Sequence, residues 1–145
     1  MILDPEQYEG LAGFRYALRR FLAASEAISR RAGVTQQQYQ AMLALRTGPP
    51  EAMTMKALSE QLLLTHHAAV QLVDRLAKAG LVERTPSSTD RRSVLLSLTA
   101  AGVGLIDRLA AEHLEEMLRQ EPLLAKSLRK LRSMGADKGV NADRS

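Results

Sequence analysis

The chain has 145 residues, with no cysteine, no tryptophan and only 3% aromatic residues. Without cysteine it can form no disulfide, no thiolate metal site and no thiol redox switch. The sequence also contains no run of about 18 apolar residues, the length that a membrane-spanning helix needs. We therefore expect a soluble, cytoplasmic protein with no membrane partner.

Catalytic and metal-binding patterns are missing as well. The sequence has no Gly-x-Ser-x-Gly, no Gly-x-Gly-x-x-Gly and no phosphate loop. His66 and His67 are adjacent, so on a helix they point about 100° apart, whereas a helical metal pair needs a spacing of four residues. All five aromatic residues precede residue 40, away from the basic segment, which argues against stacking on single-stranded nucleic acid. We expect no enzyme, no metal and no cofactor.

The charged residues are unevenly distributed along the chain. The net charge is +4 and the pI about 9.8, a modest preference for polyanions. Residues 54–98 carry six Lys and Arg against four Asp and Glu, whereas residues 99–121 carry two against five. The acidic segment is therefore not expected to face DNA, and the segment 54–98 is the better candidate.

Segment 54–98 predicts two short helices and a hairpin. Thr54 and Thr65 are typical helix N-caps, and the helix from Thr65 to Ala79 has one apolar face with Ala69, Leu72, Val73 and Leu76. Its other face is polar, with His67, Gln71, Asp74 and Lys78. Strands at 81–85 and 93–98 then flank a basic tip at 86–92. This order predicts a helix-turn-helix, whose second helix enters the DNA major groove, followed by a wing.

Helices are predicted on both sides of this lobe. One runs from Pro5 to about Gly33, and Thr35 to Gln38 form a capping box for the next, which should bury Tyr39, Met42, Leu43 and also Leu45. After the hairpin, one helix should start at Thr99 and another run from about Pro122 to Met134. The fold class is therefore mostly α with a β-hairpin wing. The long first and last segments have coiled-coil-like stripes that need a partner. They could pack on each other within one chain, or two copies could pack together, and we favour the homodimer.

Three stretches together resemble the MarR family of winged helix-turn-helix regulators. They are Leu72 to Arg84 (LVDRLAKAGLVER), Asp90 to Ser93 (DRRS) and Leu98 to Gly102 (LTAAG). The resemblance implies one domain over 1–145, with dimerisation helices at 1–33 and 99–135, a DNA-binding lobe at 34–98 and a flexible tail at 136–145. It further implies a ligand-responsive repressor that binds inverted repeats of double-stranded DNA as a homodimer.

The resemblance also places the DNA-binding residues by position. The base-reading positions fall on His66, His67, Ala68, Val70 and Gln71, where the family usually has Ser, Thr or Arg, so the operator sequence cannot be carried over. Arg75 should reach a phosphate. In the wing we expect Arg91 to enter the minor groove and Arg92 to hold the loop through Asp90.

Any regulatory signal should arrive as a bound molecule or a partner, because there is no cysteine to oxidise. A small aromatic or phenolic effector would fit a pocket where the N-terminal helices meet the DNA-binding lobe. The candidate residues for its walls and charges are Arg15, Tyr16, Arg19, Tyr39, Met42 and Arg46. The alternative is that the tyrosines and Met42 only complete the dimer core. The alternative function is a winged-helix dimer that serves as a protein-interaction or DNA-architectural module without small-molecule control.

Overall fold

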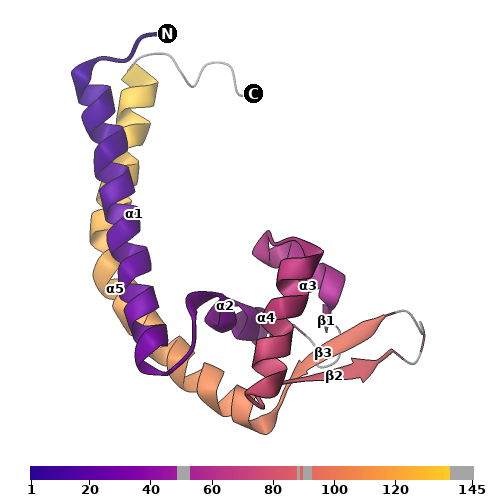
Figure 1. Cartoon of the computed structure of the whole chain (residues 1–145). Helices are drawn as coiled ribbons and strands as arrows, with labels where there is room; N and C mark the ends of the chain where they lie inside the picture. The colour runs from indigo at the N-terminus through magenta and orange to yellow at the C-terminus, as the bar shows by residue number, and fades with distance from the viewer. Residues whose placement is uncertain (49–52, 88, 90–92, 138–145) are drawn as a thin grey trace. The chain divides into compact units, whose positions relative to one another are not determined.

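The structure, a computed structural model, describes residues 1–48, 53–87, 89 and 93–137 (Figure 1). Its elements in order are α1 (Pro5–Arg31), α2 (Gln36–Thr47), β1 (Met53–Thr54), α3 (Met55–Leu62), α4 (His66–Lys78), β2 (Val82–Pro86), β3 (Val94–Leu98) and α5 (Ala100–Asp137). The predicted fold class, mostly helical with a small hairpin, is confirmed. Within the described part, no helix is long and apolar enough to span a membrane.

The chain divides into two compact units. The first combines Met1–Ala27 with the described residues from His113 onward, and the second is Ile28–Glu112. Both long helices, α1 and α5, contribute to both units. The boundaries predicted for the dimerisation helices and the DNA-binding lobe stay a prediction, and most of the predicted flexible tail, 138–145, lies outside the described residues.

The second unit holds a three-stranded antiparallel sheet in the order β1-β3-β2. β2 pairs with β3 from Val82 opposite Leu98 to Pro86 opposite Val94, as the hairpin prediction required. The short strand β1 was not predicted; it places Met53 opposite Leu96 on the other edge of β3. Leu96 and the apolar faces of the surrounding helices form the core, whose most buried large members include Met42, Leu58, Leu76, Leu96 and Ile106.

The helix starts of this unit follow the predicted caps. The Thr35 hydroxyl accepts a hydrogen bond from the Gln38 N–H at 3.1 Å, and the Gln38 side chain accepts one from the Thr35 N–H at 2.8 Å, which completes the capping box. Thr54 and Thr65 accept from the N–H groups three residues ahead, each at 3.1 Å. The prediction that Leu43 is buried is wrong. Leu43 is 36% exposed, because Tyr39, Met42 and Leu45 already occupy the inward side of α2.

The C-terminal segment is one helix, α5, rather than the two predicted helices. Pro122 lies inside it. Proline removes one helical hydrogen bond but has a helical φ, and its neighbours Glu121, Leu123 and Leu124 favour a helix, so the helix continues through it. In the first unit, the C-terminal part of α5 runs beside α1 (Figure 1). A Cβ on Gly10 would lie 2.8 Å from the Met134 sulfur, so glycine permits this close approach.

Candidate nucleic-acid interface

The turn between α3 and α4 is short and tightly bonded. Leu63 adopts a left-handed φ of 55°, and its N–H donates to the Glu60 carbonyl oxygen at 3.2 Å. The Leu64 N–H donates to the Ser59 carbonyl oxygen at 2.9 Å, and Thr65 caps the next helix. Satisfying the end of α3 in this way lets α4 start after only three intervening residues. The helix-turn-helix predicted from residues 54–79 is therefore present.

Helix α4 separates buried and exposed residues cleanly. Ala69, Leu72, Val73 and Leu76 are at most 5% exposed and anchor the helix in the core. Of the residues predicted to contact DNA, His66, His67, Gln71 and Arg75 are exposed, whereas Ala68 and Val70 are partly buried. The helix therefore offers a polar surface with hydrogen-bond donors and acceptors, held by an apolar one. Whether these six residues contact DNA stays a prediction.

Asp74 has a partner within the protein. Its carboxylate forms an ion pair with the guanidinium of Arg84 on β2. We expected Asp74 on the face presented to a partner, and we did not single out Arg84. No helical or strand periodicity links the two residues, since the contact depends on how the hairpin folds back beside α4.

The predicted wing arginines, Arg91 and Arg92, lie outside the described residues, as does Asp90. Their roles in the minor groove and in the loop stay predictions. The described part of the wing is the β2–β3 pair. On β2, the side chains from Glu83 to Pro86 are exposed and only Val82 is buried.

The predicted effector residues fall in both units. In the second unit Met42 is fully buried and Tyr39 is 7% exposed, and burial raises the pKa of the Tyr39 phenol. Arg46 donates from Nε to Asp107 Oδ1 at 2.9 Å. In the first unit Arg15, Tyr16 and Arg19 are exposed, and the Arg20 guanidinium lies 6.0 Å from the centre of the Tyr16 ring. A pocket that joins all six residues stays a prediction.

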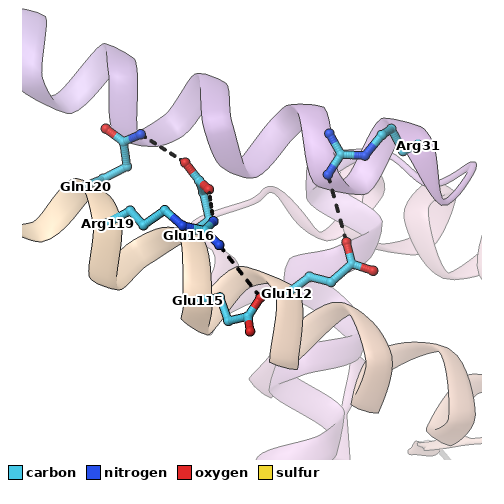
Figure 2. Close-up of polar contacts among 6 residues, drawn as sticks. All are labelled: Arg31, Glu112, Glu115, Glu116, Arg119 and Gln120. Atoms are coloured by element: carbon cyan, nitrogen blue, oxygen red, sulfur yellow. Dashed lines mark hydrogen bonds and ion pairs between the residues drawn. The ribbon is translucent and has the colours of Figure 1, made fainter.

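The acidic segment of α5 is bound by basic and amide side chains (Figure 2). Within the first unit, Arg119 lies 2.6 Å from Glu116 and 3.9 Å from Glu115, and Gln120 donates to Glu116 at 3.0 Å. Within the second unit, Arg31 lies 3.9 Å from Glu112.

Among the described residues, no group of three His, Cys, Asp or Glu could hold a metal ion.

Comparison with known proteins finds relatives that are named as helix-turn-helix transcriptional regulators. Residues 32–93 match the MarR family. The regulator FarR of Neisseria gonorrhoeae is 30% identical over 103 residues, which cover 67% of this chain and 69% of FarR. The regulator PecS of Dickeya dadantii is 37% identical over 70 residues, which cover 48% of this chain and 42% of PecS. The chain spans about half the length of most of the curated relatives that it matches.

Solved structures share the fold over nearly the whole chain. Sco3205 of Streptomyces coelicolor, a MarR family transcriptional regulator solved in complex with DNA, has a TM-score of 0.77 at 22% identity; the match covers 95% of this chain and 91% of Sco3205. NadR, solved in complex with 4-hydroxyphenylacetate, has a TM-score of 0.68 at 27% identity; the match covers 87% of this chain and 89% of NadR. The capped helix-turn-helix, the hairpin and these relatives agree: the chain belongs to the MarR family of helix-turn-helix transcriptional regulators.

Proposed function

We propose that this protein is a transcriptional regulator that binds double-stranded DNA sequence-specifically, as a homodimer on an inverted repeat. The observation that carries the proposal is the surface of α4. A helix that is buried along one side and exposes His66, His67, Gln71 and Arg75 along the other is built to insert into a major groove. The curated relatives PecS and FarR, both named as regulators of the helix-turn-helix type, support the same function.

The exposed side chains suit different parts of the duplex. Gln71 can donate to N7 and accept from N6 of one adenine, and Val70 or Ala68 can contact a thymine methyl group. Arg75, one turn further along, is suited to a phosphate. Arg91 and Arg92, which are outside the described residues, would add a minor-groove contact that responds to groove width. In this division α4 reads bases, and the arginines mainly fix its position on the DNA.

The homodimer is supported by a surface of α5 in the first unit. Leu114, Leu118 and Leu128 are 61%, 64% and 49% exposed, and with Ala125 they recur at spacings of four, seven and three residues. These spacings form the a and d positions of a coiled-coil seam. Large leucines in such a row, exposed in a single chain, favour pairing with another helix.

The charges along α5 favour the same helix of a second copy, running antiparallel. Glu115, Glu116 and Glu121 precede the middle of this segment, and Lys126, Arg129, Lys130 and Arg132 follow it. With Leu118 opposite the partner's Leu128, Glu115 would lie beside the partner's Arg129. The two-fold axis repeats this pair, so the surface complements itself. Such a dimer would bring one α4 from each copy, which matches the two half-sites of an inverted repeat.

Regulation by a small aromatic acid, with repression as the default state, completes the proposal. NadR, which is solved with 4-hydroxyphenylacetate, supports this ligand class. A ligand that prefers the DNA-incompetent state by about 2.7 kcal/mol would lower operator affinity about 100-fold. Salicylate and 4-hydroxyphenylacetate are the probes, and Arg19→Ala should blunt their effect. Release of DNA that is the same in Arg19→Ala would contradict a role for this arginine.

The main test selects duplexes from a random pool with the full-length protein. We expect enrichment of an inverted repeat with half-site centres about 10 bp apart. Affinity for the selected duplex should exceed that for a scrambled duplex of equal composition by about 10³-fold or more at about 0.15 M salt. Equal affinity for the two duplexes would instead favour the architectural module, and no binding to either would favour a protein-interaction module.

A further inference from the structure

The hairpin and α4 do not pack tightly against each other along their outer parts. A hollow of about 330 Å³ lies between them, within the second unit. Its lining combines apolar and charged side chains from α3, α4 and the hairpin: Met55, His66, Val70, Asp74, Arg84 and Val94. Two of the proposed base-contacting residues, His66 and Val70, therefore border the hollow. At the hollow, apolar packing between α4 and the hairpin cannot hold the hairpin in place, because the atoms that would make these contacts are missing there.

The attachment of β2 is correspondingly weak. Of its five residues only Val82, at the base, is buried, and the side chains from Glu83 to Pro86 are exposed. Among the described residues, the contacts of β2 beyond Val82 include its backbone pairing with β3 and the ion pair between Arg84 and Asp74. In the part of the chain that the structure describes, β2 is also an edge strand of the sheet, with no strand on its other side. The pair thus bridges the hollow from strand to helix.

We propose that Asp74 is a positioning residue that, through Arg84, fixes the hairpin relative to α4, so that both engage DNA at one set distance. The inference rests on the proposed function and extends it. It assigns Asp74 no base contact, although Asp74 lies one turn from Gln71 on the same side of α4. Both side chains are partly exposed, 47% for Asp74 and 39% for Arg84, so the pair contributes little to folding stability. The pair instead fixes the position of the hairpin relative to α4, and this position decides how well both elements can bind DNA at the same time.

A simpler account is that Asp74 only cancels the charge of Arg84. The two accounts predict different results. If only charge matters, Asp74→Asn frees a cation and raises affinity for every duplex by one factor, and Arg84→Gln lowers affinity for every duplex by one factor. If position matters, both variants lower the ratio between affinity for the selected duplex and affinity for the scrambled one. Non-specific binding tolerates a mobile hairpin, whereas specific binding does not.

The experiment measures this ratio by fluorescence anisotropy for the full-length protein and its variants. We expect Asp74→Asn and Arg84→Gln each to reduce the ratio about fivefold or more, the low end of what one good base contact contributes. The double variant should match the single variants rather than combine their effects, because either change already breaks the pair. The exchanged pair, Asp74→Arg with Arg84→Asp, should recover part of the ratio. Glu83→Gln is the matched control, since it removes a neighbouring carboxylate from β2 without touching the pair.

Hydrogen–deuterium exchange of the free protein gives a second readout that needs no DNA. Exchange of the segments 82–86 and 94–98 should rise in Asp74→Asn and Arg84→Gln, while exchange of α2 and the melting temperature stay near those of the wild type. An unchanged affinity ratio, or unchanged exchange of both segments, overturns the proposal. Failure of the proposed function looks different: the wild-type protein would then select no sequence at all.

Discussion

Gly102 should be among the least replaceable residues of the second unit, because α5 starts against the chain that leads into the hairpin. A Cβ on Gly102 would overlap the Leu81 carbonyl oxygen and lie 3.2 Å from Leu98 Cδ2. The Leu81 carbonyl accepts the Thr99 N–H at 3.0 Å, and the Thr99 hydroxyl donates to the Gly80 carbonyl at 2.6 Å. The backbone at Leu81 cannot move away from an added Cβ without loss of these hydrogen bonds. The LTAAG stretch, residues 98–102, thus ends in glycine for a steric reason.

Gly102→Ala should lower the free energy of unfolding by about 2 kcal/mol. Overpacking against backbone costs about 1–3 kcal/mol and a lost hydrogen bond about 1, while the better helix propensity of alanine returns about 1. Gly104, two residues on, is the matched control, since a Cβ there meets nothing within 4 Å. Gly104→Ala should stabilise by about 0.5–1 kcal/mol. Urea unfolding followed by circular dichroism, at one protein concentration, measures both. If Gly102→Ala is as stable as Gly104→Ala, the reasoning is refuted.

Two further predictions concern the dimer and the core. Charge reversal in Glu115→Arg should raise the dimer Kd about tenfold, since symmetry doubles the loss of a rim pair worth under about 1 kcal/mol. Adding Arg129→Glu to Glu115→Arg should lower the dimer Kd again, as measured by sedimentation equilibrium. A double variant that dimerises no better than Glu115→Arg alone would contradict the antiparallel register. Burial raises the pKa of Tyr39 in the folded protein, so above about pH 10 the phenol ionises first in the unfolded state. The stability that comes from the neutral phenol is therefore lost as the pH rises through the folded pKa. Tyr39→Phe should therefore lose less stability than the wild type between about pH 9 and 11 in urea titrations, and equal losses would contradict this.

Features set by neighbouring residues could be predicted from the sequence. Thr35, Thr54 and Thr65 cap helices through bonds to groups three residues away, and the buried face of α4 follows from a spacing within one helix. The left-handed Gly33, with φ 79°, ends α1 as its sequence suggested. Such local signals place the elements and the polar face of α4.

Features set by distant residues could not be predicted. β1 has only two residues, and only its pairing with Leu95 and Leu96 on β3 makes it a strand. The bond between Asp74 and Arg84 depends on the path of the hairpin, so Asp74 looked like a free polar residue of α4. Pro122 reads locally as a helix start, yet the favourable helix formers on both sides carry α5 through it.

The central claim is that α4 reads bases, and substitution of Gln71 tests it most directly. The measurement is the affinity of Gln71→Ala for the selected duplex and for each of its single-base-pair variants, with Gln37→Ala on the exposed start of α2 as the control. The account predicts a loss of about 1–3 kcal/mol on the selected duplex, and a loss of preference at one base pair in each half-site. Gln37→Ala should bind as the wild type does. An equal loss on every duplex, or no loss on any, would contradict the claim that Gln71 reads a base from α4.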